Sequence, residues 1–204
     1  MKEAIVTPVT NNIDWAQLPS IPIDTPISPT DAQATACAQI CYDANALYVH
    51  LSTTEEEHRA VEQGPLGMPC EDSCLEFFFC PMEEESRYIN LEFNSNGCLF
   101  LGIASCIEDL TRLVLVQKGE LEELFHPVTR LRPDGWDLTF QMPYTFIRRF
   151  FPDFAATPGR TMRANFYKCA EKVAKPHFLA WNPIFRQGRS RFHTPAEFGQ
   201  LHFE

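Results

Sequence analysis

Apolar and polar residues alternate along this chain in short stretches, and proline or glycine interrupts them at close intervals. The 204 residues include 16 prolines and 9 glycines. Alternation with a period of two is typical of strands with two different faces, whereas helices repeat every three to four residues. In the clearest case, residues 87–94, one face would carry Ile89, Leu91 and Phe93 and the other Tyr88, Asn90, Glu92 and Asn94. The pattern predicts a mostly β protein.

Turn-forming residues divide the other strand-like segments into an ordered series. Asp43-Ala44-Asn45 predicts one hairpin, and the turn at residues 132–135, with Pro133 and Gly135, predicts another. Residues 73–80 are apolar on both faces except at Glu76, which predicts a central strand. The expected strands are 34–42, 46–52, 73–80, 87–94, 98–104, 125–131, 136–142, 162–169 and 200–203.

Three further segments lack a clear strand pattern. Residues 18–31 contain four prolines and should form an extended surface connection. Residues 55–69 should form an exposed loop, with one helical turn at 55–63. Residues 145–151, followed by Pro152, are the best helical candidate. We therefore predict a single domain over residues 1–204, an all-β, antiparallel, jelly-roll-like β-sandwich with one short helix.

Charge and hydropathy narrow the classes of partner. The chain carries 27 acidic and 17 basic residues, so its formal net charge is −10, which repels nucleic acid and anionic lipid surfaces. The longest apolar segment, 99–107, is shorter than a membrane span and contains Gly102 and Ser105. No apolar stretch typical of a signal peptide follows Met1. We expect a cytoplasmic protein that binds neither nucleic acid nor membranes, and the sequence carries no signature of a particular oligomeric state.

The eight cysteines are expected to be free thiols. The sequence has no CxxC pair and no export signal, both of which would favour a disulfide framework or a metal site. Cys37, Cys41, Cys74 and Cys80 lie in strand-like segments, where cysteine usually acts as a small buried hydrophobic residue. Histidine and cysteine show no zinc-type spacing, so we expect no metal site and no cofactor.

The most informative candidate for function is the polar row formed by Tyr88, Asn90, Glu92 and Asn94, with Glu76 on a neighbouring strand. These side chains would place amide donors, carboxylate acceptors and a phenol on the wet face of one sheet. Saccharide hydroxyls both donate and accept hydrogen bonds, so they need this mixture. The alternative is a solvated outer face without a ligand. A third hypothesis, a glycoside hydrolase, would use Glu76 and Glu92 as acid and base.

The C-terminal part supplies a second candidate region. Trp181 ends a strand, and residues 186–193 form a basic stretch in an acidic protein. Aromatic rings stack on sugar rings, and arginine can bind two hydroxyls or a carboxylate. The alternative places Trp181 in the core and lets the arginines balance nearby acidic groups. The common motifs of hydrolases, zinc proteases and phosphate-binding loops are missing.

Six segments spread over most of the chain form an ordered series. They read ALYV at 46–49, PCEDSCLEFF at 69–78, YINLEFN at 88–94, RANFY at 163–167, FLAWNP at 178–183 and FHTPAEFGQL at 192–201. In this order they resemble a family 9 carbohydrate-binding module, from about residue 34 onward. The resemblance implies a β-sandwich that grips the reducing ends of glucans and xylans between two tryptophans. It also implies that a calcium ion can be bound, although no residues of this sequence are assigned to a calcium site.

Matching the family position by position gives the expected ligand site. Glu76 matches the acidic strand residue, and Asn90 and Glu92 match the polar strand positions. Cys70 stands where a tryptophan usually precedes the acidic segment, and Phe192 corresponds to the second stacking tryptophan. We predict a noncatalytic carbohydrate-binding domain whose saccharide site comprises Glu76, Asn90, Glu92, Trp181, Arg191 and Phe192. The alternative is an interaction or structural domain that has lost sugar binding, because Cys70 has no aromatic ring.

Overall fold

The computed structural model describes residues 1–204 except 11, 118 and 187–190. Its strands are β1 (Glu3–Pro8), β2 (Ile21–Ile23), β3 (Thr25–Pro26), β4 (Ala34–Tyr42), β5 (Ala46–Glu55), β6 (Ser73–Cys80), β7 (Tyr88–Asn94), β8 (Leu99–Ala104), β9 (Thr111–Leu113), β10 (Val128–Arg132), β11 (Gly135–Pro143), β12 (Thr161–Ala170), β13 (His177–Ala180) and β14 (Gly199–Phe203). Two short α-helices within the described ranges are α1 (Glu120–Phe125) and α2 (Tyr144–Ile147). The protein is mostly β, as the alternation predicts.

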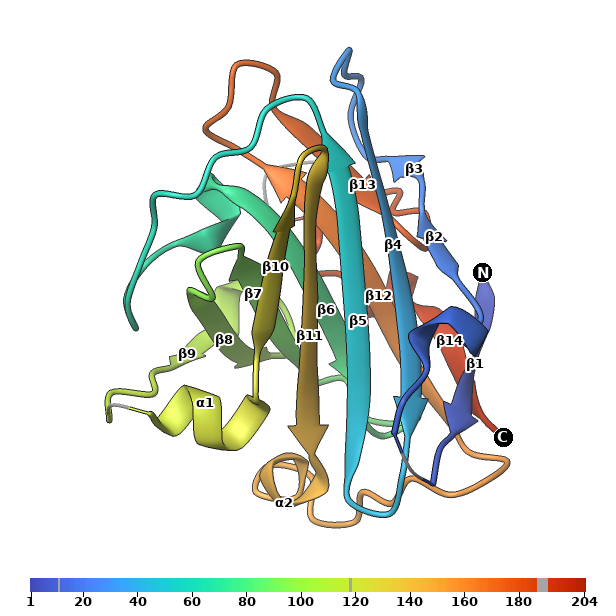
Figure 1. The fold of residues 1–204 in the computed structure, drawn as a ribbon. Helices are drawn as coiled ribbons and strands as arrows, with labels where there is room; N and C mark the ends of the chain where they lie inside the picture. The colour runs from blue at the N-terminus through green and yellow to red at the C-terminus, as the bar shows by residue number, and fades with distance from the viewer. Residues whose placement is uncertain (11, 118, 187–190) are drawn as a thin grey trace.

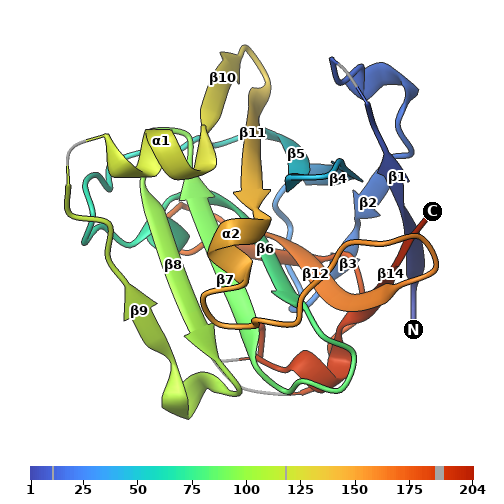
Figure 2. The same ribbon diagram turned by 90° about the horizontal axis from the view of Figure 1, so that it is seen from below.

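The strands form one continuous sheet that curls over on itself into two layers (Figure 1). The layer called the front sheet below has the order β10-β11-β5-β4, with β2 beside β4. The layer called the back sheet has the order β14-β12-β6-β7-β8-β9, with β13 beside β12 and β3 beside β13. Seen from below, the two layers face each other, and α1 and α2 lie at this end of the sandwich (Figure 2). The all-β sandwich of jelly-roll type is therefore confirmed.

The strand β1 joins the two layers. Residues 3–6 pair with β14 and residues 7–8 pair with β4, both in parallel orientation. The remaining described pairings are antiparallel, as predicted. The two parallel pairings of β1 are an exception within the predicted antiparallel sandwich, because the neighbours of β1 are reached through long connections rather than through a tight turn.

The predicted hairpins and the predicted central strand are present. The Asp43 carboxylate accepts hydrogen bonds from the backbone N–H groups of Asn45 and Ala46 (2.7 and 3.0 Å), which closes the β4–β5 turn. In the β10–β11 turn a Cβ on Gly135 would lie 1.9 Å from the Thr53 carbonyl oxygen of β5, so this position requires glycine. The strand β6 pairs with β12 and β7, and all eight of its residues are buried.

Two helices replace the single one predicted. The predicted helix at 145–151 is shorter and begins one residue earlier, as α2. Residues 120–125 form the helix α1, whose spacing places Leu121, Leu124 and Phe125 against the core. The strand expected from residue 125 therefore begins at Val128.

Two loop predictions also need correction. The proline-rich stretch contains β2, an edge strand in which Ile21 and Ile23 are buried and Pro22 is exposed. Proline is tolerated there because an edge strand needs ladder hydrogen bonds on one side only. Residues 56–63 contain no helix; instead β5 runs on to Glu55, and the loop after it is tied to the back sheet by the contacts described below.

The core between the layers is built from aliphatic and aromatic side chains of both sheets. Phe77 of β6 stacks on Phe79 and on Phe166 of β12, with ring centroids 4.8 and 4.9 Å apart. The eight cysteines are free thiols, and Cys41, Cys74 and Cys80 are buried. Among the described helices, none has the length and apolar character that crossing a membrane would require.

One ion pair lies inside the sandwich and links the two layers. The ammonium of Lys168 in β12 is 2.9 Å from the carboxylate of Glu55 in β5, and the two side chains are 0% and 1% exposed. Ser73 donates to Glu55 and accepts a hydrogen bond from the indole of Trp136 (2.9 Å). Burial alone would raise the pKa of Glu55, but the charge of Lys168 and the hydrogen bonds outweigh it, and the pKa is lowered.

The substitution Lys168→Met is expected to leave the Glu55 carboxylate buried without its cation. Removing one partner of a buried pair costs about 3–5 kcal/mol of unfolding free energy. The loss should be largest at neutral pH and shrink as pH falls, because the lowered pKa of Glu55 contributes stability only where the carboxyl is ionised. Urea denaturation at several pH values measures this loss of unfolding free energy.

The exposed lysine of the Lys172–Glu71 pair is the control, and Lys172→Met should cause no measurable change in the free energy of unfolding. Equal stability of Lys168→Met and the unmodified protein would contradict the prediction.

Candidate functional site

The polar row of β7 is buried, which corrects the prediction of a wet sheet face. Ile89, Leu91 and Phe93 point into the core between the sheets, as predicted. The other face of β7 points away from the core, yet Tyr88, Asn90 and Asn94 are 0% exposed, Glu92 is 6% exposed and Glu76 of β6 is 2% exposed. The reason is a second layer of loops that covers the outer face of the back sheet.

One covering loop is held by Asp72, the residue just before β6. Its buried carboxylate pairs with the guanidinium of Arg59 and accepts hydrogen bonds from the backbone N–H groups of Val61 and Glu62 (2.9 and 2.7 Å). The same carboxylate accepts a hydrogen bond from the Asn94 amide (2.8 Å). Asn94 therefore has a structural role, because it anchors the loop 56–72 to β7.

A second covering segment lies near the C-terminus. Tyr88 is hydrogen bonded to Nδ1 of His193 (2.7 Å), and Tyr167 of β12 donates to the carbonyl of Phe192 (3.0 Å). The ring of Phe192 stacks on that of Tyr167, with centroids 4.1 Å apart and planes at 6°. These contacts fix the described residues 191–198 over one end of the back sheet.

Between the two covering segments the outer face opens into a cavity of about 670 Å³. The strand register explains which side chains form its floor. Four neighbouring strands each contribute one residue to a row across the sheet. Tyr167 of β12 is paired with Glu76 of β6, Glu76 with Glu92 of β7, and Glu92 with Phe100 of β8. Glu76, Glu92 and Phe100 line the cavity, and so do Cys70, Cys169, Phe178, Arg191 and Phe192. The structure thus brings two carboxyl groups together beneath several aromatic rings.

The aromatic walls come from separate parts of the chain. Phe178 of β13 meets Phe192 edge-to-face at 6.2 Å between centroids. The guanidinium of Arg191 lies 5.6 Å from the centroid of Phe178 and donates to the Ile27 carbonyl (2.9 Å). On the opposite side Arg112 covers the Phe100 ring at 4.5 Å. Both arginines therefore hold rings in place by cation–π contact.

The two carboxyl groups on the floor have strongly altered acidity. Burial raises the pKa of Glu76 to about 7, although the Cys169 thiol donates to its Oε1 at 3.0 Å. Burial, and then the charge of Glu76, raise the pKa of Glu92 well above its ordinary value. Two adjacent carboxyl groups in a dry site cannot both ionise cheaply. Each carboxyl group therefore resists ionisation in the folded protein, and a protonated carboxyl can donate as well as accept hydrogen bonds.

Asn90 lies behind the cavity and positions Glu92. Its amide donates to Oε1 of Glu92 (2.8 Å). The position opposite Asn90 on β8 is Gly102, where a Cβ would lie 2.2 Å from the Asn90 amide oxygen. The glycine thus makes room for the amide, and Asn90 acts on the site through Glu92.

Trp181 was predicted in the ligand site, but the structure places it on the other side of the sheet. Its ring is 2% exposed, lies 5.8 Å from Phe166 in the core and fills the space above Gly199. Alternation along β13 and beyond puts Phe178 on the outer face and Leu179 and Trp181 on the inner face. Of the predicted site, Glu76, Glu92, Arg191 and Phe192 share the cavity. Residues 187–190 of the predicted basic stretch lie outside the described residues.

Sequence reasoning missed several cavity residues. Phe178 and Cys169 are directly paired on β13 and β12, and alternation from Tyr167 places Cys169 on the outer face. Phe100 is the strand partner of Glu92. The signal for all three was the period of two, which gives the face of a residue once its strand is identified.

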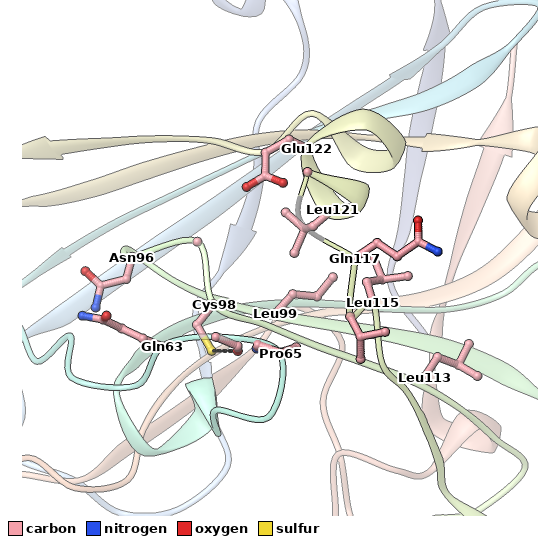
Figure 3. A pocket seen from close by; sticks show the side chains of 14 residues that line it. Gln63, Pro65, Asn96, Cys98, Leu99, Leu113, Leu115, Gln117, Leu121 and Glu122 are labelled. Carbon is pink, nitrogen blue, oxygen red and sulfur yellow. Dashed lines mark hydrogen bonds between the residues drawn. The ribbon is translucent and has the colours of Figure 1, made fainter.

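A separate cavity of about 540 Å³ lies where the β8–β9 end of the back sheet meets α1 (Figure 3). Leu99, Leu113, Leu115 and Leu121 line it together with Gln63 and Glu122 (Figure 3). None of its described lining residues is aromatic, so it lacks a platform on which a sugar ring could stack.

The residues do not fit calcium in the cavity. Within the described part of the chain, the cluster able to hold an ion is Cys74, Glu76 and Cys169, all buried. Ca²⁺ takes six to eight oxygen ligands, and two thiols are not among its ligands.

The fold and the site define a β-sandwich with a polar, aromatic-walled cavity on the outer face of one sheet. The model of carbohydrate-binding family 9 matches residues 9–203. The chain belongs to this family.

Solved structures with the same fold accompany the family match. A candidate carbohydrate-binding protein from Bacteroides uniformis is 29% identical with a TM-score of 0.83, and the alignment covers 100% of this chain and 99% of that one. A family 9 module from Caldicellulosiruptor kristjanssonii, solved with cellotriose and with glucose, is 16% identical with TM-scores of 0.63 and 0.61. These alignments cover 100% of this chain and 94% and 96% of the module, and show the likeness of fold. The comparison with curated proteins gives no match.

Burial of His193 predicts a pH dependence of stability. Burial lowers the pKa of this imidazole to about 4, whereas in an unfolded chain it is about 6.5. As pH falls below 6.5, His193 binds a proton in the unfolded chain but not in the folded protein. The free energy of unfolding therefore falls. Between pH 7 and pH 5 the unmodified protein should lose about 1–2 kcal/mol more than His193→Gln. Urea unfolding at both pH values tests this; equal losses in the unmodified protein and His193→Gln would refute it.

Proposed function

We propose that this protein binds the end of a saccharide or oligosaccharide, without catalysis, in the cavity above Glu76 and Glu92. The observation that carries the proposal is the combination of a carboxyl pair on the cavity floor with the rings of Phe100, Phe178 and Phe192 on its walls. A volume of about 670 Å³ is in the range of small-molecule sites.

The chemistry of the site supports a polyhydroxyl ligand. A carboxyl group whose pKa is raised can meet a hydroxyl as a donor when it is protonated and as an acceptor when it is ionised, and vicinal sugar hydroxyls require both kinds of partner. The guanidinium of Arg191 supplies further donors at the rim. Aromatic faces pack against the C–H faces of a pyranose. Family membership and the cellotriose and glucose complexes of the related module favour a glucan-type ligand.

The aromatic residues of this cavity differ from the two tryptophans that the family resemblance implies. Cys70 lines the cavity where the family resemblance expects one tryptophan, and Phe192 stands where it expects the other. Phe178 and Phe100 place additional rings in the same cavity. We therefore infer that the ligand is held mainly from the Phe192–Phe178 side and reaches the carboxyl pair with its polar edge.

Phe192→Ala should weaken saccharide binding by about tenfold, equivalent to about 1.4 kcal/mol, because it removes a wall ring that the underlying Tyr167 holds in place. Isothermal titration calorimetry with glucose, cellobiose, cellotriose and xylo-oligosaccharides measures the effect. Trp15→Ala is the matched control: this ring lies on the front sheet, 5.3 Å from His50, and its loss should leave binding unchanged.

The same titrations separate the competing functions. A flat response of the unmodified protein to neutral and acidic saccharides would overturn the proposal and favour an interaction domain. Release of reducing sugar that disappears in the Glu76→Gln/Glu92→Gln variant would instead show a hydrolase.

A further inference from the structure

Two thiols and a carboxylate meet at the bottom of the cavity. Cys74 and Glu76 stand two residues apart on β6 and face the same way, and Cys169 is the strand partner of Cys74 on β12. One ligand atom from each of the three residues lies within 4.8 Å of those of the other two. The Cys169 thiol and the Glu76 Oε1 are 3.0 Å apart. The cluster is therefore fixed by the pairing of two central strands.

The surroundings of the cluster leave part of it unsatisfied. All three residues are at most 2% exposed. The second carboxylate oxygen of Glu76 is buried and has no hydrogen-bond partner in the described structure. Such an atom is costly to bury unless a ligand completes its contacts. Glu76 and Cys169 both line the cavity, so the unsatisfied oxygen belongs to a site that a ligand can reach.

Charge favours a cation at this position. Glu92 is directly opposite Glu76 and lines the same cavity, as does Glu171.

We propose that Cys74, Glu76 and Cys169 bind a zinc ion at the floor of the cavity. Zn²⁺ accepts thiolate and carboxylate ligands, and in sites with three protein ligands it keeps a fourth, open position. Bonds of about 2.0–2.3 Å in a tetrahedron place ligand atoms about 3.5–4 Å apart, so small side-chain rotations suffice. Since Glu76 and Cys169 line the cavity, the fourth position faces it.

Binding requires proton release. Each thiol loses one proton to solvent as its sulfur bonds to the ion, and Glu76 loses one wherever it is protonated, so affinity should rise with pH. Zinc binding at this site is a separate property from saccharide binding, because it requires neither a sugar nor the aromatic rings of the cavity walls. It is also independent of calcium, which the two sulfurs disfavour.

The test uses the full chain, reduced and free of metal, with all eight thiols titrated to confirm the reduced state. Competition titration with a zinc-binding dye and elemental analysis should give one Zn²⁺ per chain. Co²⁺ should produce thiolate-to-metal charge-transfer absorption, which reports sulfur ligands directly. Cys74→Ser, Cys169→Ser and Glu76→Gln should each weaken Zn²⁺ binding by more than about tenfold, since even outer-shell changes reach that size.

The control is Cys80→Ser, which alters another buried cysteine on the outer face of the same strand, within a separate apolar cluster. It should bind Zn²⁺ as the unmodified protein does. Circular dichroism checks the fold of each variant. Absence of the Co²⁺ charge-transfer band in the unmodified, reduced protein would overturn the proposal even if variants misfold. So would zinc binding that survives in folded Cys74→Ser/Cys169→Ser. Because no sugar is present, neither result bears on saccharide binding.

Discussion

The back sheet is buried on both faces, and the rest of the structure follows from this constraint. Its inner face packs against the front sheet, and its outer face is roofed by loops. A polar side chain sealed under a loop must find a partner, because an unpaired buried group costs several times what a hydrogen bond contributes. The hydrogen-bonded pairs on this face are Asn94 with Asp72, Tyr88 with His193, and Asn90 with Glu92. The cavity is the part of the outer face that the loops leave uncovered.

Much of the architecture could be predicted from the amino-acid sequence alone. The period of two identified β7 and its two faces, and the doubly apolar segment 73–80 identified the centre of the sheet. Turn residues defined both hairpins. The helix α1 was missed because six residues give too short a window to separate helical spacing from alternation. Proline obscured β2, although Ile21 and Ile23 alternate around Pro22.

The candidate site was harder to predict than the fold because alternation gives the face of a residue but not what covers it. The roof depends on long-range contacts, such as the hydrogen bonds from Val61 and Glu62 to Asp72, that local sequence does not encode. Trp181 illustrates an avoidable error, since its position relative to Phe178 along the strand already places the two rings on opposite faces. The Cys74–Cys169 contact depends on register between strands about ninety residues apart, which pattern reasoning does not fix.

The strand that joins both layers also ties the beginning of the chain to its end. β1 pairs with β14 through residues 3–6 and with β4 through residues 7–8, and both termini lie along the same edge of the sandwich in Figure 1. A contact between residues so far apart in sequence forms slowly, because a loop of nearly the whole chain must close first. During synthesis the pairing of β1 with β14 cannot form until β14 has left the ribosome. Until then the edges of β1 and β12 that β14 covers stay exposed, and an exposed sheet edge is open to mispairing.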